Sequence, residues 1–359
     1  MRIVIIGGGL IGLACAWRLQ RPGVQVTVLD GAPAAREASW AAAGMLAPHH
    51  EVAPDWTGSR LALWQLGCAS LAAWPEFAAA LGGPAAVDFR HRGGLLPVLD
   101  EADALAVDQR LAWLAEHGIP GERLTSAQLQ GQEPGLAARW AARLPGAQVN
   151  PRLVALALAA ALTRAGGEVR YRQGVTGLHP GLVALADGTK VACEATVLAA
   201  GAWTPELAGL AGLPLTGAPV KGQMLRLAAP DGLLDSFVHC HHAYLVPRRG
   251  EGIVVGSTMV WDGFAKAEDP AAIAHLAANA RRVLPALTDC PVAETWTGLR
   301  PQLNGGLPVI ARIRPDLFIA TGHFRNGVLL TPVTAAAIAH LALGDPAPAD
   351  LALFAPPAG

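Results

Sequence analysis

A glycine-rich segment near the start of the chain has the spacing needed to bind phosphates. The β-branched run Met1–Ile6 leads into Gly7-Gly8-Gly9-Leu10-Ile11-Gly12, and the apolar stretch Leu10–Leu19 follows. This strand, G-x-G-x-x-G turn and helix form the dinucleotide-binding fingerprint. We expect Gly7 to make the tight turn, Gly9 to let the backbone approach a pyrophosphate, and Gly12 to let helix and strand pack closely.

The helix that follows the turn supplies the attraction for the phosphates. Its first N–H groups have no partner within the helix, and its dipole places positive charge at that end, beside Leu10 and Ile11. A second apolar strand, Val24–Leu29, ends at Asp30, where a carboxylate can accept hydrogen bonds from a ribose. Strand, turn, helix and acid together predict a dinucleotide site.

A run of small residues follows the second strand. Ser39–Leu46 reads Ser-Trp-Ala-Ala-Ala-Gly-Met-Leu, where an ordinary nicotinamide-binding fold would continue its alternation of helix and strand. Small side chains allow the backbone to approach a large flat group. A tight turn between helices is the alternative explanation of the same run.

Four consecutive residues, His239-Cys240-His241-His242, contain metal-ligand types. Neighbouring positions on a strand point to opposite faces, so we do not expect the four to converge on one ion. We predict no metal site.

Composition narrows the class of protein. The chain has 359 residues, of which 52% are hydrophobic and 15% charged, with a net charge of −1. A chain this long and apolar buries a large core, in about two domains, and is not disordered. Near-zero charge gives no reason to expect nucleic acid or an anionic membrane as a partner. No apolar stretch is long enough for a membrane span.

The cysteines and the N-terminus indicate the compartment. Five scattered cysteines without C-x-x-C spacing fit reduced thiols better than disulfides or zinc. Arg2 and the following apolar residues superficially resemble a secretion signal, but glycines interrupt the run and complete the nucleotide fingerprint. We therefore expect a cytoplasmic protein.

Apolar spacing and helix-boundary residues predict the elements around these motifs. Asn150-Pro151 begins a helix that stops at Gly166, and Asp269 begins another that runs to Leu284. Further helices are predicted at 59–81, 102–117, 126–130 and 328–343, and strands at 90–99, 168–170, 175–178, 182–185, 189–192, 196–201, 219–227, 237–247, 252–257 and 316–322.

These elements predict an α/β (α+β) chain: a discontinuous Rossmann-like nucleotide-binding domain with an inserted antiparallel-sheet domain that binds the substrate. The nucleotide-binding domain is expected to contain residues 1–85, 143–216 and 298–359. The inserted domain is expected to contain residues 86–142 and 217–297.

Five motifs in a fixed order extend over nearly the whole length: the opening fingerprint, Ala41–Leu46 (AAAGML), His242–Arg248 (HAYLVPR), Gly298–Gln302 (GLRPQ) and Gly322–Leu330 (GHFRNGVLL). With them the chain resembles the D-amino acid oxidase-like FAD oxidoreductases. Within that family it is similar to the glycine oxidases of thiamine biosynthesis.

The resemblance implies FAD, bound non-covalently, in place of NAD. Where relatives usually carry a hydroxyl residue this chain has Ala38, and Asp30 replaces a commoner glutamate. The cofactor-binding residues implied are Gly7, Gly9, Leu10, Ile11, Gly12, Asp30, Gly31, Ala38, Ser39, Ala43, Gly44, Met45, Val175, Gly201, Gly322, His323, Phe324, Arg325, Asn326, Gly327, Val328 and Leu329.

The resemblance also implies a substrate site. Arg300 would hold the substrate carboxylate, with Tyr244 and Arg325 nearby, and His242 and Met259 would line the pocket. A planar, permanently charged guanidinium is well suited to grip a carboxylate with two parallel hydrogen bonds. In isolation an arginine is more often a partner in a surface ion pair.

The activity implied is oxidative deamination of glycine and small amines such as sarcosine and D-alanine. The products would be imine or glyoxylate, ammonia and hydrogen peroxide, with oxygen as acceptor and the imine feeding thiazole synthesis. A homotetramer is also implied. The alternatives are a sarcosine oxidase, a D-amino acid oxidase or dehydrogenase, and a non-catalytic FAD-binding subunit.

Overall fold

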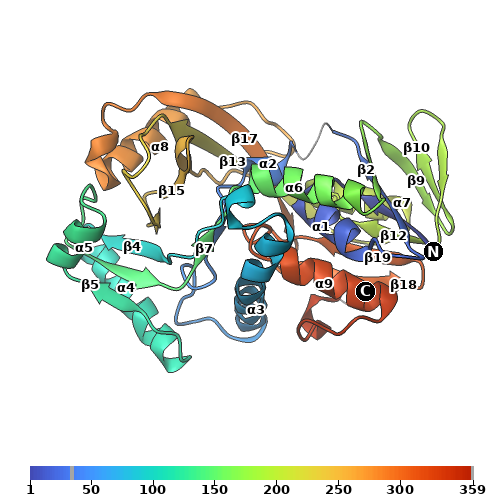
Figure 1. Cartoon of the computed structure of the whole chain (residues 1–359), viewed down its shortest axis with the longest axis horizontal. Helices are drawn as coiled ribbons and strands as arrows, with labels where there is room; N and C mark the ends of the chain where they lie inside the picture. Colours follow the sequence, from blue (N-terminus) through green and yellow to red (C-terminus); the bar gives the residue numbers. More distant parts are fainter. Residues whose placement is uncertain (33–35, 357–359) are drawn as a thin grey trace.

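The structure of the chain is a computed structural model, and it describes residues 1–32 and 36–356. Within these residues two large sheets form the framework, and they lie toward opposite ends of the molecule (Figure 1). The first sheet has six strands in the order β18 (Val309–Arg314), β19 (Leu317–Thr321), β12 (Ala195–Leu198), β1 (Arg2–Ile6), β2 (Gln25–Asp30) and β8 (Glu168–Tyr171).

Strand β1 is central because both of its faces are apolar. It pairs in parallel with β2 and β12, and its side chains alternate between two cores. Ile3 and Ile5 face the helices, whereas Val4 and Ile6 face a small three-stranded sheet and α7 (Thr204–Leu210). That sheet consists of β9 (Val175–His179), β10 (Leu182–Leu185) and β11 (Lys190–Ala192). A strand buried on both faces is typical of a parallel sheet covered on both sides.

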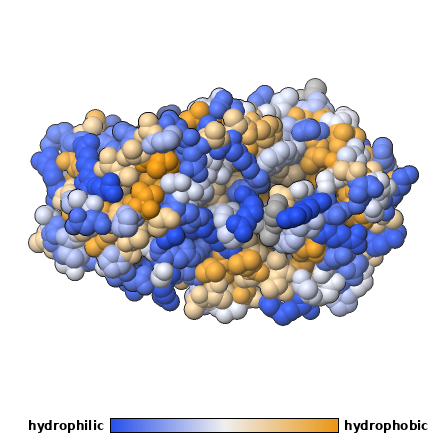
Figure 2. Space-filling model, turned by 90° about the horizontal axis from the view of Figure 1, so that it is seen from above, coloured by the Kyte–Doolittle hydropathy of each residue, from blue (hydrophilic) through white to orange (hydrophobic). Residues whose placement is uncertain are grey.

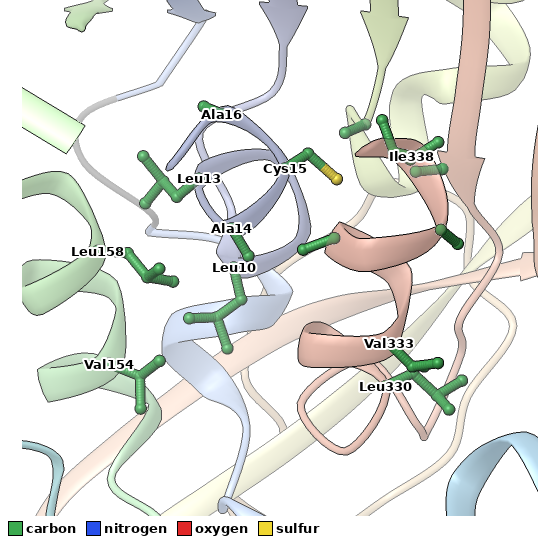
Figure 3. Close-up of a cluster of buried hydrophobic side chains, with 14 of the residues drawn as sticks. Leu10, Leu13, Ala14, Cys15, Ala16, Val154, Leu158, Leu330, Val333 and Ile338 are labelled. Atoms are coloured by element: carbon green, nitrogen blue, oxygen red, sulfur yellow. The ribbon is translucent and has the colours of Figure 1, made fainter. Parts of the chain in front are cut away.

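Four helices share the apolar core on the first face of this sheet. They are α1 (Leu10–Leu19), α3 (Gly58–Ala80), α6 (Pro151–Arg164) and α9 (Thr331–Leu343). Helices α1, α6 and α9 contact strands of the sheet, and α3 packs on α9. Figure 3 shows α1 lying between α6 and α9, with Leu13 turned toward Leu158 of α6 and Cys15 toward α9. This packing holds the start of α1 in place beside the first turn of the chain.

The second sheet has eight strands among the described residues. Their order is β17 (Val292–Leu303), β13 (Gly217–Leu227), β16 (Gly252–Gly256), β15 (Tyr244–Arg248), β14 (Phe237–His239), β4 (Gly94–Val98), β6 (Trp140–Leu144) and β5 (Glu122–Leu124). Three helices accompany it: α4 (Glu101–Glu116), α5 (Ser126–Gln132) and α8 (Pro270–Val283). The long pair β13 and β17 extends from this sheet toward α2 (Ala38–Ala41) and the nucleotide-binding side (Figure 1).

Short elements complete the chain. Strands β3 (Met45–Leu46) and β7 (Ala147–Gln148) pair with each other. The 3-10 helices are Pro84–Val87, Gly201–Trp203, Pro285–Leu287 and Ala352–Phe354.

The α/β architecture with a large inserted sheet agrees with the prediction, and so do several helix boundaries. Asn150 caps α6 by accepting the Arg152 N–H through Oδ1 at 3.1 Å, and Asp269 caps α8 by accepting the Ala271 N–H at 2.9 Å. Pro332 lies in the first turn of α9, where its missing N–H costs little.

Two predicted elements were wrong in detail, and one long strand was not predicted. The predicted strand 237–247 is two strands, β14 and β15, because residues 240–243 form a turn between them. The final helix begins at Thr331 and not at Val328. Strand β17 was not predicted, because Gly298 and Pro301 indicate a turn; the structure places Pro301 opposite Pro219 within the β13–β17 pair.

Residues 143–144 and 298–303, which the predicted domain division assigns to the nucleotide-binding domain, continue strands β6 and β17 of the eight-stranded sheet. The division itself stays a prediction.

Polar and apolar residues are mixed on the surface of the molecule. Figure 2 shows hydrophilic and hydrophobic residues interspersed over one face, with the hydrophobic ones in separate small groups. Among the described residues no helix combines the length and the apolar character that a membrane crossing requires.

Candidate functional site

The first turn is shaped by glycines that have no room for a side chain. Gly7 has φ of +111°, and a Cβ there would lie 2.3 Å from the Ala199 carbonyl oxygen. A Cβ on Gly12 would lie 1.8 Å from the Gly7 carbonyl oxygen. The turn therefore folds back closely on the start of α1, which brings the backbone N–H groups to the surface of a cavity.

The N-terminus of α1 has donors to offer a phosphate. The Leu10 N–H donates to Ser39 Oγ at 2.9 Å, so the small-residue run reaches the helix end. Among the residues that the structure describes, the N–H groups of Gly9 and Ile11 have no acceptor. Unpaired donors at a helix N-terminus are the usual basis of pyrophosphate binding.

Asp30 lies at the end of β2 beside the same turn. Its Oδ2 accepts the Gly8 N–H at 2.5 Å and its Oδ1 accepts the Ala32 N–H at 2.7 Å. Burial raises the pKa of the Asp30 carboxyl, and the two backbone hydrogen bonds oppose that rise. The backbone thus fixes the carboxylate at the edge of the cavity, in the place expected for a ribose contact.

A single cavity of about 550 Å³ extends from this turn to the eight-stranded sheet. Its size and mixed lining are in the range of sites for small ligands and cofactors. The predicted cofactor residues that line it are Gly7, Gly9, Leu10, Ile11, Asp30, Gly31, Ala38, Ser39, Ala43, Gly44, Met45, Val175, Gly201, His323, Phe324, Arg325, Gly327 and Val328. The structure does not place Gly12, Gly322, Asn326 or Leu329 in the lining.

The small-residue run forms one wall of the cavity. Gly44 has φ of +100°, and a Cβ there would lie 2.0 Å from the Val149 carbonyl oxygen. Helix α2 packs so closely on β17 that a Cβ on Gly298 would lie 2.4 Å from that of Ala41. The backbone of this run is therefore pinned from behind, and the wall presents small groups to whatever fills the cavity.

The turn before α9 forms the facing wall. Ser70 Oγ and Trp74 Nε1, both on α3, donate to the Leu329 carbonyl oxygen at 2.6 and 2.9 Å and hold the turn in place. Within the described part of the chain, the N–H groups of Gly327 and Val328 have no acceptor. The turn thus offers backbone donors to the cavity, although it precedes the helix and is not its first turn.

Arg300 is the charged group at the far end of the cavity. It lies on β17 opposite Val220 of β13. Its Nη2 donates to Ser257 Oγ at 2.6 Å and its Nη1 to the Thr258 carbonyl oxygen at 3.2 Å. Across the described residues no carboxylate lies within 4.0 Å of this guanidinium. The side chain is therefore held in position with its positive charge unpaired.

The strand opposite Arg300 makes room for it. A Cβ on Gly222 would lie 2.3 Å from Nη1 and 2.4 Å from Nη2 of Arg300. Gly222 and Ser257 both line the cavity, and neither was predicted. A small residue facing a clamped arginine is a signal that becomes visible only when the strand pairing is known.

Tyr244 reaches the same end of the cavity from β15. It lies opposite Gly256, where a Cβ would be 2.4 Å from the phenol oxygen. Its hydroxyl donates to Met224 Sδ at 3.0 Å. A thioether is a weak acceptor, so a stronger acceptor on a ligand can take over this proton.

Arg325 also lines the cavity, but its charge is already paired. Its Nη2 donates to Glu51 Oε1 at 2.5 Å, and the same oxygen lies 3.9 Å from His239 Nε2. Glu51 lines the cavity as well and was not predicted. The two arginines therefore differ: Arg300 is free to meet an anion, and Arg325 shares its charge with Glu51.

The structure does not bring His242 or Met259 into the cavity. His242 lies in the turn between β14 and β15, where its ring is 3.7 Å from that of His241. Met259 follows β16 with 44% of its surface exposed. Neither side chain is among the residues that line the cavity, and the prediction that both line the substrate pocket stays a prediction.

A Rossmann-type turn, a cavity walled by small residues and an unpaired arginine at its end define the class of a flavin-dependent oxidoreductase. The family comparison agrees. The profile described as "DAO: FAD dependent oxidoreductase" matches residues 2–341. The chain belongs to this family, and its cofactor is FAD.

Individual relatives show which members of this family the chain is similar to. The chain is 33% identical to a "Glycine oxidase" of Pseudomonas putida over 97% of both chains. It is 37% identical to a "Bifunctional protein ThiO/ThiG" of Nostoc over 94% of this chain, but it spans only about half, 52%, of that relative. It superposes on the crystal structure of glycine oxidase from Geobacillus kaustophilus with a TM-score of 0.89, at 30% identity, over 99% of this chain and 98% of that one.

Proposed function

We propose that this chain catalyses the FAD-dependent oxidative deamination of glycine and other small amines such as sarcosine and D-alanine. The observation that carries the proposal is the unpaired Arg300 guanidinium, fixed by Ser257 and Thr258 at the end of the FAD cavity. The near full-length similarity to glycine oxidases supports the choice of a small amino acid as substrate.

Arg300 is the residue that can bind the carboxylate of the substrate. A carboxylate can replace solvent at the guanidinium and receive two parallel, charge-assisted hydrogen bonds. Its position is set before binding, because Ser257 Oγ and the Thr258 carbonyl oxygen each hold one terminal nitrogen. Anchoring the carboxylate fixes where the Cα–H and the amino group lie, so orientation accounts for much of the rate.

The flavin supplies the two-electron acceptor that no side chain provides, because it accepts a hydride equivalent. The protein contributes hydrogen-bond donors to the cofactor and the substrate. The N–H groups of Gly327 and Val328 can offset negative charge on the cofactor side of the cavity. The Tyr244 hydroxyl can exchange its weak bond to Met224 for one to the substrate.

The overall reaction balances without another protein group. The amine loses two electrons and two protons to give an imine, and water hydrolyses the imine to glyoxylate and ammonia. Oxygen receives the electrons and gives hydrogen peroxide. The imine can alternatively feed thiazole synthesis, and the joining of ThiO to ThiG in the name of the Nostoc relative supports this placement in thiamine biosynthesis.

The other activities considered from the sequence have less support. The full-length relatives compared are glycine oxidases, which does not favour a sarcosine oxidase or a D-amino acid dehydrogenase. We propose non-covalent FAD, since the residues found to line the cavity include no cysteine. A homotetramer, oxygen as acceptor and a cytoplasmic location remain part of the proposal, to be measured by sedimentation, peroxide detection and fractionation.

Removal of the arginine tests the function. In Arg300→Ala we expect the Michaelis constant for glycine to rise by about 100-fold or more, because two charge-assisted hydrogen bonds are lost, while the visible spectrum of bound FAD stays intact. Arg60→Ala removes an exposed, peripheral arginine and is the matched control. Steady-state oxidation with peroxide detection measures both variants.

Two outcomes would contradict the proposal. Unchanged kinetics in Arg300→Ala would mean that the carboxylate is anchored elsewhere. If glycine, sarcosine and D-alanine all fail to bleach the flavin of the wild-type protein under nitrogen, the chain is an FAD-binding protein and not an amine oxidase.

A further inference from the structure

A group of metal-ligand side chains lies outside the FAD cavity. The turn between β14 and β15 carries His241 and His242, and both lie beside Asp103 in the first turn of α4. Histidines that alternated along one strand would point to opposite faces. His241 and His242 occupy a turn instead, so their rings lie on the same side, with centroids 3.7 Å apart.

The donor atoms are close enough to share one ion. His241 Nδ1 lies 3.1 Å from Asp103 Oδ1, and one ligand atom from each of the three residues lies within 4.8 Å of the others. Two ligands of a tetrahedral zinc, each at about 2.0–2.1 Å, are separated by about 3.3 Å. The His241–Asp103 pair has nearly that spacing, and a small rotation of His242 completes the set.

The surrounding structure already fixes the side chain of one ligand, Asp103, and the backbone of a second, His242. The Asp103 side chain is 6% exposed, and its Oδ2 accepts the Leu99 N–H at 3.0 Å, which leaves Oδ1 turned toward His241. The His242 carbonyl oxygen accepts a hydrogen bond from Asn279 Nδ2 of α8 at 3.0 Å, so the turn is tied to a second helix. Buried outer contacts of this kind orient metal ligands.

The imidazole ring of His242 has one nitrogen whose hydrogen-bonding capacity is not satisfied. Its Nε2 is buried, and among the described residues it has no hydrogen-bond partner. A buried polar atom without a partner is costly and calls for a ligand, a water or an ion. His241, by contrast, has a 64% exposed side chain, so an ion can enter and keep a water from that side.

Charges near the cluster leave it negative. Asp100 caps α4 next to Asp103, and Arg282 of α8 lies 3.7 Å from Asp100 Oδ2. One of the two carboxylates is therefore balanced by Arg282, and the other, Asp103, faces the two imidazoles. Two imidazoles and one carboxylate are a ligand set preferred by zinc and other late first-row divalent metals, not by magnesium or calcium.

We propose that Asp103, His241 and His242 bind one divalent transition-metal ion, with zinc as the reference ion, at a site separate from the FAD cavity. The fourth position is open to solvent. The ion would join α4 to the β14–β15 turn, two residues before Tyr244. It would therefore stabilise the eight-stranded sheet at the strand that carries a residue of the amine pocket.

Zinc titration of the FAD-loaded full-length protein tests the site by calorimetry. We expect one zinc ion per chain in the wild type. His241→Ala and His242→Ala should each weaken the affinity by at least the roughly 10–100-fold typical of losing an outer contact of a metal site. His179→Ala removes an exposed histidine from the distant strand β9 and should bind like the wild type.

A second measurement does not depend on activity. Saturating zinc should raise the unfolding temperature of the wild type and of His179→Ala but not of His241→Ala, because a ligand stabilises only the folded state that binds it. His241 is largely exposed, so this variant is expected to fold even if His242→Ala does not. Absence of zinc binding in the wild type, or equal affinity in His241→Ala, would overturn the proposal.

Discussion

Substituting Gly222 by alanine should disable the carboxylate anchor without touching Arg300 itself. The new Cβ would lie 2.3, 2.4 and 2.5 Å from Nη1, Nη2 and Cζ of Arg300. Nonbonded contacts settle near 3.5 Å, so the guanidinium has to move by about 1 Å. The move also strains its hydrogen bonds to Ser257 and Thr258, which otherwise define its position.

The size of the effect follows from the displacement. A misplacement of about 1 Å in a positioning group costs on the order of 100-fold in rate, which is about 2.7 kcal/mol of transition-state stabilisation. We therefore expect kcat/KM for glycine to fall by between roughly 10- and 100-fold in Gly222→Ala. The protein should still bind FAD, because Gly222 lies in β13 and not in the glycine turn before α1.

The assay is steady-state glycine oxidation with peroxide detection, together with the rate of flavin bleaching by glycine under nitrogen. Gly131→Ala is the matched control, since a Cβ at this helical position meets nothing within 4 Å. A value of kcat/KM within about twofold of the wild type would refute the reasoning, because it would show that the guanidinium either does not move or does not hold the substrate.

Three further perturbations address other parts of the site. In Gly12→Ala the Cβ would lie 1.8 Å from the Gly7 carbonyl oxygen, so we expect protein purified without yellow colour, and full FAD content would contradict this. In Glu51→Gln the Arg325 guanidinium loses the negative charge that lies 2.5 Å away, so a dicarboxylic amine such as iminodiacetate should inhibit glycine oxidation at least several-fold better; equal inhibition constants would count against this. Burial lowers the pKa of His323 from 6.5 to about 3. Between these two values the imidazole is protonated in the unfolded chain but neutral in the folded chain. The free energy of unfolding should therefore fall by about 2 kcal/mol by pH 5 from this group alone. Urea unfolding at pH 7.5 and 5 measures that loss, which should be smaller in His323→Gln; identical pH dependence in the two proteins would show that His323 is not responsible.

The phosphate turn was predictable from the sequence because its geometry is local. The positive φ of Gly7 belongs to the turn itself, and a Cβ on Gly12 would meet the Gly7 carbonyl oxygen only five positions earlier. The close approach of Ala199 to Gly7, by contrast, depends on the fold. The helix that follows creates the anion site by its own termini. Capping residues such as Asn150 act over two residues and were predictable for the same reason.

The amine end of the cavity depends on pairing between distant strands. Arg300 is held by Ser257 and Thr258, more than forty positions earlier, and faces Gly222 across β13. The sequence around Pro301 indicates a turn, because proline lacks the N–H that a central strand uses; only the tertiary structure shows that β17 is an edge strand, where proline is tolerated.

The pairing of charged side chains depends on the tertiary structure. Whether an arginine is free or paired depends on which carboxylate the fold brings near, and Glu51 lies 274 positions from Arg325. In the same way, Asp103 and His241 lie 138 positions apart and meet only in the folded chain. The segment predicted as one strand contains a turn, which places His241 and His242 on the same side. The sequence alone therefore determined the FAD turn and its helix, whose geometry is fixed by near neighbours. The tertiary structure alone decided which side chains meet at the amine site and at the histidine turn, since electrostatic pairing depends on distances in space.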